Sequence, residues 1–255
     1  PVLPDTEFLI NPKAPFETYP CRELCGGALA FKLAEALLGE EAFCYLDMAA
    51  VATIGDMVPL LGENRVIAAL GMEKLKKEPA PGLRYLAEVS KIDVTGINAR
   101  KIAFSLVPRL NAAGRMTHGS DAFKLLTEED ERICLALAKE LDLQNKKRQT
   151  IQKKITEEAV LRARQQKNRA ETRLLVSCQK GWDKGVLGLA AASLVQTFCR
   201  PALVLSESEE GILTGSARSI PGVNLYRILL TCADKYLNFG GHEMAAGLSL
   251  KAADM

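Results

Sequence analysis

Residues 127–168 read TEEDERICLALAKELDLQNKKRQTIQKKITEEAVLRARQQKN, and this stretch decides how the chain is organised. It contains neither glycine nor proline, which favours one long helix with a rise of ~1.5 Å per residue. Thr127 followed by Asp130 resembles a capping box, and acidic residues at the start and basic residues at the end suit the helix dipole. So polar a helix is expected to be a solvated connector between two domains, with a coiled-coil partner face as the alternative.

Upstream of this connector, the spacing of apolar residues predicts a helical region. Leu24, Ala28 and Phe31 recur at steps of three and four and form one apolar stripe. An Ala-rich run that is apolar on nearly every side is interrupted only by Asp47 and Asp56, and it predicts a buried helix. Helices are expected at 22–38, 45–61, 64–77 and 82–89.

Downstream of the connector, short strand-like runs alternate with helices. Strands are expected at 173–177, 202–206 and 212–217, and helices at 185–198 and 223–234. Glu209, Glu210 and Gly211 form a turn before the third strand, so a hairpin is expected there. This alternation predicts a sheet packed against helices, and the fold class is therefore α/β.

Size and composition agree with two globular domains. The 255 residues are 48% hydrophobic and 25% charged, which is close to average usage. The 33 lysine and arginine residues against 31 aspartate and glutamate residues give a net charge of +2, which neither demands nor excludes a nucleic-acid partner. The sequence contains no signal peptide and no apolar run of about 18 residues, so no membrane span or membrane partner is expected.

Seven cysteines lie singly along the chain, mostly within apolar runs. This pattern predicts buried free thiols in a reducing cytoplasm. Cys21 and Cys25 resemble half of a zinc site, but no second pair of Cys or His at ligand spacing accompanies them. Free thiols are therefore the favoured interpretation.

Three segments combine glycine, arginine and small polar residues in a way that core packing does not require. The first, 108–115, holds Arg109, Asn111 and Arg115, which can offer guanidinium groups and backbone N–H groups to a phosphate. A loop with arginine–carboxylate pairs explains the same residues equally well. The second, 215–219, holds Ser216, Arg218 and Ser219 just before an expected helix, where helix N–H groups also favour an anion.

The third segment, 240–247, begins with paired glycines. Gly240 and Gly241 permit close approach of the backbone to a ligand, and His242 adds a ring that can donate to a phosphate or stack. A structural histidine with its hydrogen bonds satisfied is the competing interpretation of His242.

Asp47 and Asp56 are the candidate metal ligands. A carboxylate within an apolar helix is costly to bury unless it meets a cation or several donors. Helix capping or a buried hydrogen bond is the alternative. Nine residues apart on a helix, the two carboxylates face opposite sides, so at most one of them is expected in any one site.

The order of these segments around the long connector resembles the RecJ exonucleases of the DHH phosphoesterase superfamily. Upstream, the blocks that resemble the DHH catalytic domain are 11–13, 24–27 with 31–33, 52–60 with 63–65, and 108–115. Downstream, the blocks that resemble the DHH-associated domain are 181–182, 185–188, 215–219 and 240–248. The resemblance implies that residues 1–126 are the C-terminal part of the catalytic domain, 127–168 the connector helix, and 169–255 the smaller, nucleic-acid-binding domain.

The resemblance implies 5′-3′ exonuclease activity on single-stranded DNA with Mn²⁺ or Mg²⁺, in repair and recombination, with replication or repair proteins as further partners. The family's DHH triplet is absent, so the chain is expected to be an inactive internal piece that begins just after it. Of the metal ligands the resemblance leaves Asp56, with Asp47 as the less favoured choice. It assigns the DNA grip to Arg115, Ser216, Arg218, Ser219 and His242, with Arg218 holding the 5′ phosphate.

Two departures and two alternatives accompany this resemblance. Where the family has His-Pro after Gly-Trp, this chain has Asp183 and Lys184, which removes any role for a histidine in that loop. By the same resemblance, the family's oligonucleotide-binding β-barrel beyond the Gly-Gly-His block is expected to lie outside these 255 residues. The alternatives are a phosphodiesterase acting on short oligoribonucleotides or cyclic dinucleotides, and a non-catalytic nucleic-acid-binding scaffold.

Overall fold

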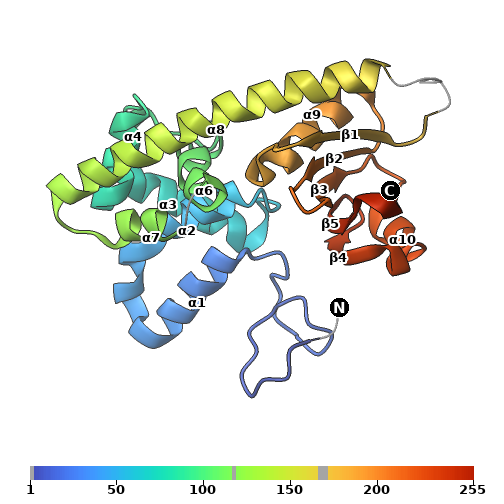
Figure 1. The fold of residues 1–255 in the computed structure, drawn as a ribbon. Coiled ribbons are helices and arrows are strands. Elements are labelled where there is room, and N and C mark those ends of the chain that lie inside the picture. Colours follow the sequence, from blue (N-terminus) through green and yellow to red (C-terminus); the bar gives the residue numbers. More distant parts are fainter. Residues whose placement is uncertain (1–2, 117–118, 166–171) are drawn as a thin grey trace. The chain divides into compact units, whose positions relative to one another are not determined.

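The computed structural model describes residues 3–116, 119–165 and 172–255. The chain forms two compact units, Pro1–Asn145 and Lys146–Met255. The helix α8, Glu131–Gln165, runs without interruption through the boundary between them (Figure 1). The long helix is therefore confirmed, and residues 166–168 of its predicted extent lie outside the described residues. The expectation that it is solvated is wrong, because Leu141 and Ala159 on one stripe of α8 are completely buried in the cores of the first and second unit.

The start of α8 corrects the predicted capping box. Thr127 is the last residue of the preceding helix, and its hydroxyl donates to the carbonyl of Phe123 at 3.0 Å. The N-cap role falls to Asp130, whose Oδ1 accepts from the backbone N–H groups of Arg132 at 2.8 Å and Ile133 at 3.3 Å. Asp and Thr are both good caps, and the position of the turn between the two helices decides which one is used.

The described part of the first unit contains helices and loops but no strand, so all strands of the α/β fold described here lie in the second unit. Its helices are α1 (Gly26–Leu38), α2 (Leu46–Gly55), α3 (Gly62–Lys77), α4 (Pro81–Val89), α5 (Ala99–Lys101), α6 (Val107–Met116) and α7 (Ser120–Thr127), with a π-helical turn at Ile102–Leu106. At the contact of α2 with α3, a Cβ on Gly71 would lie 2.3 Å from the carbonyl oxygen of Leu46. Only glycine permits so close an approach.

The buried helix expected at 45–61 ends early, at Gly55. Met57 has a left-handed φ of 57°, and Val58, which precedes Pro59, is disfavoured in a helix. The helix expected from residue 22 begins at Gly26, because the Sγ of Cys25 accepts from the N–H of Ala28 at 3.3 Å and caps it. Residues 56–61 therefore leave the helix and bring Asp56 to the surface.

The second unit is a five-stranded sheet in the order β1-β2-β3-β5-β4. The strands are β1 (Leu175–Lys180), β2 (Ala202–Glu207), β3 (Ile212–Arg218), β4 (Tyr236–His242) and β5 (Ala245–Lys251); β1 and β2 are parallel and the other pairs antiparallel. The hairpin β2–β3 confirms the predicted turn. The hairpin β4–β5 was not predicted, because its glycines are rare inside strands.

Helices cover the two faces of this sheet unequally. On one face α9 (Leu187–Phe198) and the second half of α8 bury Leu175, Ala202 and Val204. On the other face α10 (Leu225–Leu230) packs on an apolar cluster formed by residues such as Leu213, Ala217, Leu248 and Leu250. Alternation along β3 therefore places Ser216 and Arg218 on the face of α9. Among the described residues, no helix is long and apolar enough to cross a membrane.

Candidate functional site

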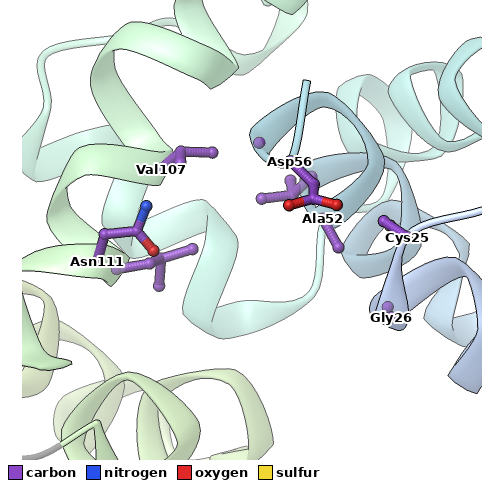
Figure 2. Close-up of a pocket in the computed structure, with 10 residues that line it drawn as sticks. Cys25, Gly26, Ala52, Asp56, Val107 and Asn111 are labelled. Carbon is purple, nitrogen blue, oxygen red and sulfur yellow. The ribbon is translucent and has the colours of Figure 1, made fainter. Parts of the chain in front are cut away.

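The first candidate site is a pocket where the end of α2 meets α6. It has a volume of 330 Å³ and is lined by Cys25, Gly26, Gly27, Val51, Ala52, Gly55, Asp56, Val107, Leu110 and Asn111. A Cβ on Gly55 would lie 2.9 Å from Cγ2 of Val107, so the glycine lets the two helices meet here. Asp56 and Asn111 lie on opposite sides of the pocket (Figure 2).

Asp56 follows the last residue of α2 as its C-cap, with its backbone N–H donating to the carbonyl of Ala52 at 2.9 Å. Its side chain is exposed and belongs to the lining of the pocket. An exposed carboxylate suits Mn²⁺ or Mg²⁺ as one ligand among several. In the part of the chain that the structure describes, no group of three His, Cys, Asp or Glu residues lies close enough together to hold a metal ion.

Asp47 occupies a different environment. It is completely buried in the first turn of α2. Its Oδ1 accepts from the N–H of Met48 at 2.9 Å, and its Oδ2 accepts from the N–H of Ala80 at 2.8 Å. Both oxygens are thus hydrogen-bonded, Oδ1 within α2 itself and Oδ2 to the residue that precedes α4, which is the buried hydrogen-bonding role that was the alternative to metal binding.

The segment 108–115, expected to be a loop or a short anion-binding segment, is part of the helix α6. Arg109 is mostly buried; its Nε and Nη2 each donate to Oδ1 of Asp142 at 2.9 Å, and its Nη1 donates to the carbonyl of Ser105 at 2.8 Å. Its guanidinium group therefore braces α6 against α8. Asn111 lines the pocket, and Arg115 is exposed near the end of the helix. In this segment Arg109 therefore has a structural role, whereas Asn111 and Arg115 are exposed and can reach a ligand.

The second candidate site lies on the sheet of the second unit. Ser216 and Arg218 are two residues apart on β3, on the face of α9. A Cβ on Gly188, the second residue of α9, would lie 2.7 Å from Nη2 of Arg218 and 3.5 Å from Cβ of Ser216. The guanidinium group of Arg218 is thus seated against bare helix backbone. The role of Gly188 was missed from the sequence, although a glycine inside a helical pattern is a signal of such close packing.

His242 lies in the same row of the sheet as Arg218. In the strand register Arg218 pairs with Ala245, and Ala245 pairs with His242. His242 is exposed, and its Nδ1 accepts from the N–H of Met244 at 3.3 Å. Gly241 has a φ of 153°, and a Cβ there would lie 2.3 Å from the carbonyl oxygen of Ala245. Glycine is therefore required at the end of this hairpin.

Ser219 and Asp183 have local structural roles. Ser219 is buried, and its hydroxyl donates to the carbonyl of Val223 at 2.6 Å, which holds the turn before α10. Asp183, where a histidine was expected by resemblance, accepts from the N–H of Gly185 at 2.9 Å and caps a short 3-10 turn ahead of α9. The group of residues brought together on the sheet is therefore Ser216, Arg218 and His242.

Comparisons with known proteins find one family model and several relatives. The family model described as "DHHA1 domain" matches residues 171–255. The single-stranded-DNA-specific exonuclease RecJ of Bacillus subtilis (strain 168) is 46% identical over 256 residues, which cover 100% of this chain and 32% of that protein. The protein of the same name from Escherichia coli (strain K12) is 33% identical over 271 residues, covering 98% of this chain and 47% of that protein.

A solved structure of a protein with the same name has a similar fold. The crystal structure of RecJ from Thermus thermophilus in complex with Mg²⁺ is 30% identical and superposes with a TM-score of 0.77. The similarity covers 88% of this chain and 34% of that one. The chain thus spans between about a third and a half of the length of the proteins it matches.

Proposed function

The chain belongs to the RecJ family of the DHH superfamily, and from this premise we propose that it is the strand-gripping part of a metal-dependent 5′-3′ exonuclease that degrades single-stranded DNA. Removal of nucleotides from a 5′ end is a step of DNA repair and recombination, and we propose that the protein takes part in these processes. The metal ion is Mn²⁺ or Mg²⁺. Such ions activate a water molecule and stabilise the charge that develops during attack on phosphorus.

The proposal rests on the position of the Arg218 side chain. Its guanidinium lies against Gly188 at the beginning of α9, beside Ser216 and in one row with His242. A planar guanidinium group is well suited to bind a phosphate through two hydrogen bonds. We assign the terminal 5′ phosphate to Arg218 and Ser216, with His242 as an additional donor.

Domain roles follow from the same proposal. We assign residues 1–126 to the C-terminal part of the catalytic domain, 127–168 to the connector, and 169–255 to the nucleic-acid-binding domain. In the first domain Asp56 is assigned as one metal ligand, and Asn111 and Arg115 as contacts to the strand. Arg109 supports them indirectly, because its guanidinium group is held by Asp142. Gly241 and Ser219 shape the loops of the second domain.

The proposal places the protein in the cytoplasm, where its DNA substrate would lie. All seven cysteines, each of which lies within the described residues, are free thiols. Free thiols persist in a reducing compartment. Replication or repair proteins are proposed as further partners, since resection acts on strands that such proteins expose.

The experiment that tests the proposal is a binding titration by fluorescence anisotropy. The chain is titrated against a labelled single strand with a 5′ phosphate and against the same strand with a 5′ hydroxyl. We expect tighter binding of the phosphorylated strand, and we expect Arg218→Ala to abolish that preference at a cost of about 10- to 100-fold in affinity. Arg227→Ala, which removes an exposed arginine on α10, is the control and should leave the preference intact. Equal affinity of the unsubstituted chain for both strands would contradict the assignment of Arg218.

A further inference from the structure

The face of the sheet that carries Arg218 continues past it as a polar surface. Along β3 the buried residues Leu213, Gly215 and Ala217 alternate with the half-buried Thr214 and Ser216. Leu213 and Ala217 belong to the apolar cluster under α10. Residues 212, 214, 216 and 218 therefore lie together on the opposite face.

The strand register extends these positions into rows that cross three strands. Ser216 pairs with Gly247, which pairs with Gly240. The next row contains Thr214, Ser249 and Asn238, and the row after it pairs Ile212 with Lys251. Neighbouring rows are two residues apart along each strand, or ~6.8 Å, which is roughly the length of one nucleotide in an extended single strand.

The residue types in these rows suit the binding of an anion. Cations stand at both ends, Arg218 in the first row and Lys251 in the last. The two rows between them hold only glycine, hydroxyl and amide residues. The end rows add Ala245, His242 and Ile212, and none of the residues that β3, β5 and β4 contribute to the four rows is acidic. Among the described residues, none forms a hydrogen bond with the side chains of Thr214, Ser249 or Asn238.

The surface is open on the side of β4 and β5. Gly247, Asn238 and Lys251 are exposed. On β2 the row of Thr214 continues to Ser206, which is buried and whose hydroxyl donates to the carbonyl of Trp182 at 2.6 Å, so the surface is closed on that side. A ligand that follows the rows therefore runs along β5, over Gly247 and Ser249.

Resting on the function proposed above, we infer that these rows bind the sugar–phosphate backbone of the single strand beyond its terminal phosphate. Asn238 and Ser249 form one phosphate subsite, and Lys251 forms the next. The glycines at 240 and 247 leave room for the backbone to lie close to the sheet. Tyr236 and Phe239 of this hairpin pack in the cluster under α10 on the opposite face, so beyond the row of His242 this surface binds backbone and does not stack bases.

The test compares 5′-phosphorylated thymidylate dinucleotides and hexanucleotides. The dinucleotide reaches only the rows of Arg218 and Ser216, whereas the hexanucleotide spans all four rows. We expect Lys251→Ala, and separately Asn238→Ala combined with Ser249→Ala, to weaken binding of the hexanucleotide about three- to tenfold and to leave the dinucleotide unchanged. The dependence of the hexanucleotide's affinity on salt should become shallower by about 0.7 in log–log slope for Lys251→Ala.

The matched control is Lys235→Ala, which removes an exposed lysine that lies just before β4, outside the rows. It should change neither affinity nor slope. An equal loss for both oligonucleotides, or no loss for either, would overturn the inference and leave the assignment of Arg218 standing. Failure of the unsubstituted chain to bind either oligonucleotide would contradict the proposed function and the inference together.

Discussion

A Cβ placed on Gly188 would lie 2.7 Å from Nη2 of Arg218 and 3.3 Å from its Cζ. The contact joins the first turn of α9 to the last residue of β3. A glycine inside a helix and an arginine at the end of a strand are each weak evidence for a functional site. The contact shows that the two belong to one site. The consequence is that the position of the guanidinium group depends on the absence of a side chain at residue 188.

Gly188→Ala should therefore weaken binding of a 5′-phosphorylated single strand without unfolding the protein. The atom that the new methyl group meets is the far end of a flexible side chain, so the guanidinium group can move aside at little cost. We expect a loss of about tenfold in affinity, equivalent to ~1.4 kcal/mol, with a thermal midpoint within a few degrees of the original. Anisotropy and circular dichroism measure the two quantities.

Gly215→Ala makes an informative contrast on the same strand. There a Cβ would lie 2.4 Å from the carbonyl oxygen of Val204, which cannot move without disturbing the sheet. This variant should lose stability as well as binding. If Gly188→Ala instead lost stability to the same extent while keeping its preference for the phosphorylated end, the positioning role of Gly188 would be wrong.

Arg109 should act on stability and not on recognition of the 5′ phosphate. Arg109→Ala leaves the mostly buried carboxylate of Asp142 without this ion pair, which typically costs about 3 kcal/mol. The double variant Arg109→Met with Asp142→Leu should recover part of that loss, because it removes both charges. Urea unfolding measures the free energy. A loss of the 5′-phosphate preference at unchanged stability would instead indicate that Arg109 contacts DNA.

The pKa of Tyr19 predicts how the stability of the first unit changes at alkaline pH. Burial and the hydrogen bonds from its hydroxyl to Glu63, at 2.7 and 2.9 Å, raise the pKa of Tyr19 to about 12. Because the folded pKa lies above the ordinary value of about 10, the contribution is complete below pH ~10 and is lost as the pH rises towards 12.

Tyr19→Phe should be less stable than the unsubstituted chain by about 1 kcal/mol at pH ~8. The difference between the two proteins should shrink as the pH is raised above ~10, since the phenylalanine has no proton to lose. Urea unfolding at several pH values tests this. A constant difference up to pH ~12 would show that the hydroxyl of Tyr19 is not held by Glu63.

Asp56 should contribute to metal binding without making the chain a nuclease. One carboxylate on the pocket supplies one ligand, and two-metal hydrolysis requires several. With added Mn²⁺ the chain is expected to leave a labelled single strand intact in a gel assay. Hydrolysis by the purified chain that disappears in Asp56→Asn would show that the described residues supply more of the catalytic centre than we expect.

Sequence patterns predicted the elements that are long or strongly periodic. The connector, the helices α1 to α4 and the hairpin β2–β3 follow from periodicity, charge and a Glu-Glu-Gly turn, whereas the helices α5 to α7 were not predicted. The hairpin β4–β5 was missed, because Gly240 and Gly241 weaken a strand pattern and only pairing with β3 and β5 stabilises it. Asp130 replaced Thr127 as the cap because both residues can cap a helix and tertiary packing fixes the turn.

The candidate site was predictable by residue type and only partly by geometry. Arg218 and Ser216 were singled out by residue type on one segment, and the structure places them on one face of β3, where residues two apart lie on the same side. Gly188 could not be assigned, because its partner is thirty residues away and only the fold brings them together. The same holds for Arg109, whose partner Asp142 lies on another helix.

The most direct test of the central claim, that this chain grips single-stranded DNA, compares binding of a single strand and of a blunt duplex of the same sequence. Both carry a 5′ phosphate and both are titrated by anisotropy over a range of salt concentrations. We predict tighter binding of the single strand at every salt concentration, with an affinity that falls as salt rises because phosphates are contacted. Equal or tighter binding of the duplex would contradict the claim.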